Sequence, residues 1–188
     1  MPVTIIKTRI PDVVIIEPAV FRDKRGFFLE TYNKNMLLKN GLDVTFVQDN
    51  HSHSERGTLR GLHYQLMYPQ AKLVFVVRGA VFDVAVDIRR GSPTFGTWIG
   101  EVLSEENKRQ MYIPEGFAHG FCVLSDSADF MYKCTDFYHP EDDRGINWND
   151  PSLGVTWPIT GPTLSEKDTG LPLLEEISPD LLFSYDVA

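Results

Sequence analysis

The stretch TLRGLHYQ, residues 58–65, places an arginine and a histidine three positions apart in a segment with the spacing of a β-strand. An imidazole can remove or return a proton near neutral pH, and it is also a common metal ligand. A guanidinium binds phosphate or carboxylate oxygens through paired hydrogen bonds. A single histidine in such a strand can equally be a packed structural residue. The residue types alone therefore leave packing, metal binding and proton transfer open.

Strand alternation predicts where these side chains point. Leu62 and Tyr64 look like core residues, so His63 faces the other side and would line a cavity if that side is the lumen of a barrel. Arg60 then points away from His63, unless Gly61 permits a bulge or Arg60 reaches around an edge of the sheet.

The other histidines are weaker candidates. His51 and His53 alternate in DNHSHSERG, so they could point the same way and chelate a metal. No third ligand is evident nearby, which makes this interpretation weak. His119 ends a Pro-x-Gly-x-x-His turn that leads into a strand.

Two tyrosines and an aspartate could complete a proton-transfer site. Tyr132 and Tyr138 fall on one parity of the run DFMYKCTDFY, where they could line a pocket or simply pack with a hydroxyl partner. A carboxylate beside an imidazole fixes its tautomer and raises its basicity, so a base at His63 requires such a partner. Asp168 in LSEKDTG is unremarkable on its own, so at this point the role requires an aspartate without identifying it.

Three single basic residues, Arg25, Arg60 and Lys72, lie in predicted strands or turns. Most arginines and lysines only solvate a surface. Arg25 and Arg60 each precede a glycine, which suits a backbone that approaches a ligand closely, and Lys72 begins the apolar run KLVFVV. These three residues are candidates to bind an anion.

The elements that must position these residues are mainly strands. Residues 80–88 alternate between apolar side chains and the carboxylates of Asp83 and Asp87, and several short runs separated by Gly and Pro follow. Helical patterns are few, with NKNMLLKNG and LPLLEEIS as candidates for short helices. We therefore predict an all-β fold of the sandwich, jelly-roll or small-barrel type.

Length, charge and cysteine content limit the architecture and the partners. The chain has 188 residues, so we expect a single domain over residues 1–188, whose Gly-, Pro- and Ser-rich part from about residue 150 wraps irregularly over the core. A formal net charge of −8 argues against nucleic acid as a partner. Two cysteines give no disulfide framework, and we find neither a signal peptide nor a run that would span a membrane. We expect a soluble cytoplasmic protein with no membrane partner.

Several segments together resemble one family. The resemblance runs in order through DKRGFFLETY, FVQDNHSHS, GTLRGLHYQ, AKLVFVVRGAVFDVAVDIRRGSPTFG, YIPEGFAHGF, YHPEDDRGINWNDP and LSEKD, and it covers nearly the whole chain. The family is dTDP-4-dehydrorhamnose 3,5-epimerase, a group of metal-independent, cupin-like enzymes of dTDP-rhamnose synthesis. The resemblance implies a double-sheet jelly roll, a cupin-like barrel with a few short helices. It also implies a homodimer whose arms exchange across the interface.

The resemblance further implies a role for individual residues. By position, the proton acceptor falls on His63, the proton donor on Tyr132, and the carboxylate that orients the histidine on Asp168. Contacts to the nucleotide sugar fall on Arg25, Glu30, Gln48, Asp49, Asn50, Arg60, Lys72, His119 and Lys167. Asp143 stands where the family usually has a glutamate contact, and Tyr138 matches an aromatic position that stacks on the base.

The implied reaction converts dTDP-4-keto-6-deoxy-D-glucose to dTDP-4-keto-L-rhamnose by inverting C3 and C5. Both carbons flank the C4 carbonyl, so one base can remove either proton as an enolate forms, and Lys72 is the candidate to stabilise the enolate oxygen. No redox cofactor is required, because nothing is oxidised overall. Metal-binding cupins usually carry a second histidine where this chain has Gln65, so we expect no metal.

Two alternatives stay open. A relative that inverts only one carbon, or that acts on another dTDP-4-keto-deoxysugar, would share the base and the nucleotide contacts. A non-catalytic cupin that binds a sugar nucleotide or a metal needs no matched acid and base, and the set His63, Tyr132 and Asp168 weighs against it.

Overall fold

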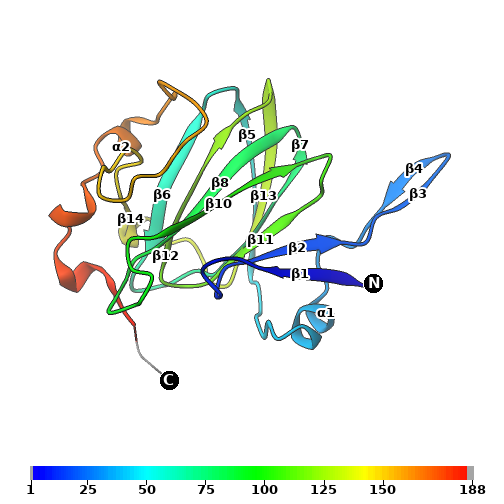
Figure 1. Ribbon diagram of the computed structural model, residues 1–188, viewed down its shortest axis with the longest axis horizontal. Coiled ribbons are helices and arrows are strands. Elements are labelled where there is room, and N and C mark those ends of the chain that lie inside the picture. The colour runs from blue at the N-terminus through cyan, green and yellow to red at the C-terminus, as the bar shows by residue number, and fades with distance from the viewer. Residues whose placement is uncertain (1, 186–188) are drawn as a thin grey trace.

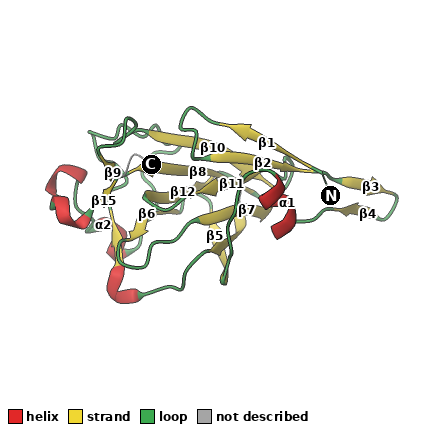
Figure 2. Cartoon of the chain, turned by 90° about the horizontal axis from the view of Figure 1, so that it is seen from below, coloured by secondary structure: helices red, strands yellow, loops and turns green. Residues whose placement is uncertain are grey.

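The computed structural model describes residues 2–185 and shows two antiparallel β-sheets that face each other (Figures 1 and 2). In order across the six-stranded sheet, the strands are β1 (Val3–Lys7), β2 (Val14–Pro18), β11 (Gln110–Ile113), β7 (Lys72–Arg78), β13 (Ser127–Cys134) and β5 (Gln48–Glu55). The five-stranded sheet has the order β10 (Trp98–Ser104), β8 (Ala80–Asp87), β12 (Phe117–Val123), β6 (Leu59–Gln65) and β14 (Asp143–Gly145). This arrangement confirms the predicted all-β, double-sheet jelly roll.

The remaining elements are short. A hairpin joins β3 (Phe21–Asp23) to β4 (Gly26–Phe28), and β9 (Arg89–Arg90) pairs in parallel with β15 (Phe183–Ser184). The helices are α1 (Lys34–Lys39), α2 (Glu166–Thr169) and the 3₁₀ turns Pro140–Asp142, Leu174–Glu176 and Pro179–Leu181. None of these helices of residues 2–185 is long and apolar enough to cross a membrane.

The two predicted helices have different outcomes. The first is confirmed as α1, where the Asn33 side chain accepts a hydrogen bond from the backbone N–H of Met36 at the helix start. In LPLLEEIS, only the three-residue 3₁₀ turn Leu174–Glu176 forms, so the prediction of a helix there was too long.

A hydrophobic core fills the space between the sheets. The six-stranded sheet contributes Val74, Val76 and Phe130, and the five-stranded sheet contributes Ala85 and Phe121, all of them buried. Fully burying a side chain such as Phe130 stabilises the fold by about 1.5–3 kcal/mol. The core stops short of one end of the sandwich, where polar side chains replace the apolar ones.

The outer face of the five-stranded sheet is also covered. Leu62, Tyr64 and Val84 pack there against Leu153 and Trp157, which belong to the C-terminal part of the chain. Because β8 is buried on both faces, Phe82, Val84 and Val86 face this cover, while Val81 and Ala85 face the space between the sheets. Asp83 and Asp87 share the parity of Val81 and Ala85 and therefore also face the space between the sheets.

A β-bulge at Gly61 resolves the orientation of β6. His119 of β12 lies opposite His63, but Phe121 lies opposite Arg60, so two residues of β6 oppose one residue of β12. The extra residue turns Arg60 to the same side as His63. Gly61 has a φ of +117°, and a Cβ atom there would lie 2.6 Å from the Cα of Gly120. Glycine is therefore required at this position.

The β3–β4 hairpin, residues 21–28, extends away from the two sheets (Figure 1). Phe21, Phe27 and Phe28 are 51, 52 and 60 % exposed. Three phenylalanines on one short ribbon form an apolar surface that residues 2–185 leave about half exposed, although Lys108 lies over the Phe27 ring.

Candidate active site

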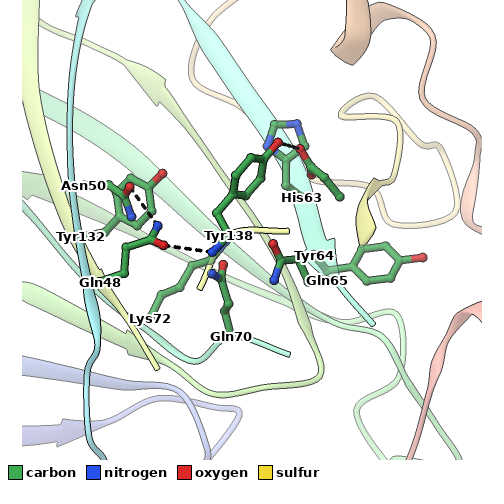
Figure 3. A pocket seen from close by; sticks show the side chains of 10 residues that line it. Gln48, Asn50, His63, Tyr64, Gln65, Gln70, Lys72, Tyr132 and Tyr138 are labelled. Atoms are coloured by element: carbon green, nitrogen blue, oxygen red, sulfur yellow. Dashed lines mark hydrogen bonds between the residues drawn. The ribbon is translucent and has the colours of Figure 1, made fainter. Parts of the chain in front are cut away.

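A cavity with two adjoining lobes opens between β5 and β6, the strands that lie at or near the edges of their sheets. The larger lobe, with a volume of about 440 Å³, is lined by polar groups that include Gln48, Asn50, Gln70 and Tyr138 (Figure 3). The smaller lobe, of about 260 Å³, adds Ser52, Arg60, His119, Lys167 and Asp168. Both lobes share His63, Lys72, Tyr132 and Asp143.

His63 is oriented by a buried carboxylate. Its Nε2 lies 2.6 Å from Oδ1 of Asp168, whose side chain is almost fully buried. Asp168 belongs to α2, and the Ser165 side chain caps this helix by accepting from the Asp168 backbone N–H at 3.1 Å. The carboxylate fixes the imidazole proton at Nε2, so Nδ1 is the nitrogen left to act as a base.

Asp168 is held in its charged form. Burial tends to raise the pKa of Asp168, but the hydrogen bonds from His63, Ser165 and the Gly61 backbone outweigh burial and lower it. An ionised Asp168 also stabilises the imidazolium that forms when His63 accepts a proton.

Tyr132 reaches the cavity from the opposite sheet. It belongs to β13 of the six-stranded sheet, whereas His63 belongs to β6 of the five-stranded sheet, and the two side chains lie on opposite sides of the space in Figure 3. Burial raises the pKa of the Tyr132 phenol, which therefore stays protonated at neutral pH. A molecule between them would meet a base on one side and an acid on the other.

The cavity contains cations that can hold an anion. Arg60 donates from Nε to the Ser54 hydroxyl at 3.0 Å and lines the smaller lobe. Lys72 lies at the start of β7, where burial lowers the pKa of its ammonium group. Lys167 of α2 forms an ion pair with Asp143. A phosphate or a developing oxyanion could be stabilised here despite the negative net charge of the chain.

Tyr138, Asp143 and Lys167 form a bridge at the edge of the cavity. The Tyr138 hydroxyl donates to Oδ2 of Asp143 at 2.8 Å, and the same oxygen accepts from Lys167. The hydrogen bond to Asp143, together with burial, raises the pKa of Tyr138 to about 12. Gln48 accepts from the Tyr138 backbone N–H at 2.9 Å and so fixes the loop that carries this ring. The cavity contains Asp143 in the position predicted for an acidic contact, but whether it binds a ligand stays a prediction.

Three predicted contact residues do not bring their side chains to this cavity within one chain. Arg25 lies on the β3–β4 hairpin, is largely exposed and pairs with Asp23 at 2.6 Å. Glu30 follows the hairpin and accepts from Asn33 at 3.1 Å. Asp49 points to the outer face of β5, where its carboxylate pairs with Lys133 at 2.8 Å. For these residues, the role in binding stays a prediction.

The remaining predicted residues lie together in the cavity. They are Gln48, Asn50, Arg60, His63, Lys72, His119, Tyr132, Tyr138, Asp143, Lys167 and Asp168. They come from β5, β6, β7, β12, β13, β14, α2 and the loop before the first 3₁₀ turn, so both sheets and one helix contribute.

Several polar residues at or near the cavity were not selected from the sequence, among them Gln70, Asp83 and Ser52. Asp83 is fully buried, and both of its carboxylate oxygens lie within 3.0 Å of Nε2 of His119. Ser52 lines the smaller lobe, and its Oγ is a buried side-chain atom without a hydrogen-bond partner in the described part of the chain. The alternation of side chains along a strand could have identified Asp83 and Ser52. Asp83 is a charged residue within an apolar strand, and Ser52 lies on the same face of its strand as Gln48 and Asn50.

The histidine pair considered as a metal site lies elsewhere. Nε2 of His51 and Nδ1 of His53 lie 3.1 and 3.0 Å from the same oxygen of Asp129, on the outer face of the six-stranded sheet. Within residues 2–185, no group of three or more His, Cys, Asp or Glu side chains is arranged to hold a metal ion.

Comparison with known proteins identifies a family and several enzymes that this chain is similar to. Residues 7–176 match the family described as dTDP-4-dehydrorhamnose 3,5-epimerase. The enzyme of that name from Pseudomonas aeruginosa is 63 % identical over 161 residues, which cover 85 % of this chain and 89 % of the relative. The one from Shigella flexneri is 61 % identical over 166 residues, covering 87 and 92 %.

A solved structure is similar over nearly the entire chain. The dTDP-6-deoxy-D-glucose-3,5-epimerase of Legionella pneumophila, crystallised in complex with dTDP-4-keto-L-rhamnose, is 53 % identical and superposes with a TM-score of 0.97. The match covers 99 % of this chain and 100 % of that one. The similarity therefore includes every segment that lines the cavity.

Proposed function

The chain belongs to the dTDP-4-dehydrorhamnose 3,5-epimerase family, and we propose that His63 and Tyr132 carry out its reaction as base and acid from opposite walls of the cavity. The reaction is the epimerisation of dTDP-4-keto-6-deoxy-D-glucose at C3 and C5, which gives dTDP-4-keto-L-rhamnose in dTDP-L-rhamnose biosynthesis. The observation that supports these roles is the placement of an oriented imidazole and a protonated phenol on facing sheets of one cavity.

His63 removes the proton. The hydrogens on C3 and C5 are both acidified by the C4 carbonyl, so each can be taken by the same nitrogen, Nδ1, if the ring of the sugar presents both carbons in turn. The C–H electron pair becomes the enolate, with its negative charge on the C4 oxygen. Asp168 keeps Nδ1 as the basic nitrogen and stabilises the imidazolium.

Tyr132 returns a proton to the opposite face of the same carbon. Inversion requires this opposite placement, because reprotonation by His63 would restore the starting configuration. A phenol with a raised pKa stays protonated at neutral pH and can still donate to a carbon as basic as an enolate. The phenolate is then reprotonated from solvent and the imidazolium loses its proton, so no net proton is consumed.

Lys72 stabilises the enolate, and other cations hold the nucleotide. The Lys72 ammonium group lines both lobes next to the proposed acid and base, where it can stabilise the charge on the C4 oxygen. Arg60 and Lys167 suit the pyrophosphate, since both are basic side chains that line the smaller lobe. Gln48, Asn50 and Tyr138 line the larger lobe, where amides can bind the edge of thymine and an aromatic ring can stack on it.

Two copies of the chain complete one site. Arg25 and Glu30 are two of the three predicted contacts whose side chains do not reach the cavity of their own chain, and the hairpin beside them exposes three phenylalanines. A homodimer in which each hairpin reaches the other chain would bury this apolar surface and bring Arg25 to the neighbouring cavity.

Deuterium exchange tests the function directly. The protein is incubated in heavy water with dTDP-4-keto-6-deoxy-D-glucose, and C3 and C5 are followed by NMR. Deuterium at both carbons with inverted configuration is the expected result. Exchange at one carbon only would indicate a single-position epimerase, and no exchange by folded, dTDP-binding protein would contradict the assignment.

A further inference from the structure

A second carboxylate–imidazole pair lies beside the proposed base. His119 of β12 is the register partner of His63 of β6, so the two imidazoles are neighbours across adjacent strands. Nε2 of His119 lies 3.0 and 2.9 Å from the two oxygens of Asp83 on β8. Asp83 is fully buried, and the His119 side chain is 8 % exposed. His63 is therefore paired with Asp168, and His119 is paired with Asp83.

The pairing determines where His119 carries its proton. A carboxylate can only accept, so Nε2 of His119 must carry a hydrogen and donate it to Asp83. Burial lowers the pKa of His119, and the neighbouring positive charges of Lys72 and His63 act in the same direction, while Asp83 opposes them. The ring is therefore neutral at neutral pH, and its Nδ1 carries a lone pair. In residues 2–185, Nδ1 of His119 has no hydrogen-bond partner.

The charge of Asp83 is compensated differently from that of the other carboxylates near the cavity. Asp143 is paired with Lys167, and Asp168 with His63, which becomes cationic during the reaction. Asp83 bonds only to a neutral imidazole, so its negative charge is not cancelled by its hydrogen-bond partner.

Lys72 is the cation on which this charge acts. Burial lowers the pKa of the ammonium group, and the negative charges of Asp143 and Asp83 oppose this effect. In the part of the chain that the structure describes, Lys72 makes neither a salt bridge nor a side-chain hydrogen bond. The ionisable groups that line the cavity with Lys72 or act on its charge come from β6, β8, β12, β13, β14, α2 and the loop before the first 3₁₀ turn. They are Arg60, His63, Asp83, His119, Tyr132, Cys134, Tyr138, Asp143, Lys167 and Asp168.

We propose that Asp83 is a positioning residue of this site: it fixes His119 as a neutral hydrogen-bond acceptor toward the bound sugar and holds Lys72 in its ammonium form. The proposal rests on the proposed function, because an acceptor suits a hexose hydroxyl and an ammonium group is needed where the enolate oxygen forms. Asp83 acts through these two side chains and does not touch the reacting carbons.

Asp83→Asn tests the proposal. The asparagine side chain can accept from Nε2 of His119 through its oxygen or donate to it through its nitrogen, so the imidazole proton is no longer confined to Nε2. Removal of the negative charge lets the pKa of Lys72 fall further, so the alkaline limb of the kcat profile is expected to move to lower pH. We expect kcat to fall about 10- to 100-fold, less than the roughly 10²–10³ for loss of an oxyanion partner itself, because Lys72 is still present. The affinity for dTDP alone is expected to stay within about twofold.

The tautomer of His119 gives a readout that does not depend on activity. ¹⁵N NMR of the imidazole nitrogens is expected to show His119 protonated at Nε2 in the unmodified protein, and a population protonated at Nδ1 only in Asp83→Asn. His119→Gln identifies the signal by removing it. Because the first measurement uses the unmodified chain, it tests the proposal even if Asp83→Asn does not fold.

A surface carboxylate provides the matched control. Asp126, whose side chain is 98 % exposed, loses the same charge in Asp126→Asn without a change in the cavity, so the alkaline limb should stay in place. The proposal is overturned if the unmodified protein carries the His119 proton on Nδ1, or if Asp83→Asn keeps both kcat and its alkaline limb. If the unmodified protein fails to exchange deuterium at C3 and C5, the proposed function fails instead, and the tautomer still tests the pairing of Asp83 with His119.

Discussion

Nε2 of His63 lies 2.6 Å from Oδ1 of Asp168, although the two residues are 105 positions apart in the sequence. Asp168 reaches His63 because α2 is capped by Ser165 and lies against β6. The hydrogen bond engages one nitrogen of the ring and leaves the other free to act as a base. The proposed catalytic geometry therefore depends on the position of α2 against the five-stranded sheet.

Replacement of His63 by asparagine is expected to abolish hydrogen exchange at both carbons. The amide has no basic nitrogen, and a positioned base typically contributes about 10²–10⁴ in rate. Affinity for dTDP should change little, because the nucleotide contacts are other residues. Exchange at C3 and C5 in heavy water, followed by NMR, measures the effect. If His63→Asn retains full turnover, His63 is not the base.

Tyr132→Phe should separate proton removal from inversion. The base remains, so hydrogen at C3 and C5 should still exchange, but the acid on the opposite face is lost and inverted product should fall by about 10²–10⁴. The ratio of exchange to inverted product is the measured quantity. An unchanged ratio would show that another group or water delivers the proton.

The sequence predicts the fold and most of the site, for identifiable reasons. Alternation in β6 gives the orientation of Leu62 and Tyr64. The orientation of Arg60 depends on the bulge at Gly61, which could not be predicted because it arises from the pairing of β6 with β12, where Gly61 lies against Gly120. Most residues that line the cavity belong to the seven segments on which the family resemblance is based, and they come from both sheets.

Asp83 and the β3–β4 hairpin show what the sequence leaves out. Asp83 is one of two carboxylates in the same apolar strand, and only Asp83 meets an imidazole, His119, from the neighbouring strand. The other, Asp87, is bonded by Arg89 in a turn. The sequence signal is the same for both, so their different surroundings could not be predicted. The position of Arg25, outside the cavity of its own chain, likewise depends on the direction in which the hairpin leaves the sheet.

Asp87 is expected to stabilise the protein in a pH-dependent way. Burial tends to raise the pKa of Asp87, but hydrogen bonds from Arg89, Ser92 and Thr94 outweigh burial and lower it. A lowered pKa means that the carboxylate stabilises the fold above its unfolded pKa of about 3.9 and that this contribution is lost as pH falls through the folded value. Asp87→Asn should therefore lower the free energy of unfolding at pH 7 by about 3 kcal/mol, as when one partner of a buried pair is removed.

Urea denaturation at pH 7 and at pH 3 measures this effect of Asp87→Asn. The difference from the unmodified protein should shrink at pH 3, and Asp126→Asn serves as an exposed control with little change at either pH. An equal loss at both pH values would mean that shape, and not charge, accounts for the contribution of Asp87.

Two serines on the same face of β5 should respond in opposite ways to removal of the hydroxyl. The Ser54 hydroxyl accepts from Nε of Arg60, so Ser54→Ala is expected to lower the free energy of unfolding by about 1–2 kcal/mol. Ser52 Oγ is buried without a partner in residues 2–185, so Ser52→Ala removes no hydrogen bond and should keep or raise the stability, by up to about 1 kcal/mol. Urea denaturation without ligand compares the two, and a loss at Ser52 equal to that at Ser54 would contradict the difference in their bonding.

The proposed exchange of hairpins predicts complementation between two inactive chains. Arg25 lies on the hairpin, and His63 lies in the cavity of the body. In a mixed dimer of Arg25→Ala and His63→Asn, the first chain keeps its own His63 and receives an intact hairpin from the second. One complete site forms in each mixed dimer, whereas the other site lacks both residues.

Coexpression with two different affinity tags allows the mixed dimers to be purified. They are expected to show about half of the wild-type activity, because one of the two sites in a two-fold dimer is complete. A mixed dimer of His63→Asn and Tyr132→Phe is the control, since both residues belong to the cavity of a single chain and neither site can be restored by a hairpin. Activity no higher in the first mixture than in the second would show that Arg25 does not serve the neighbouring cavity.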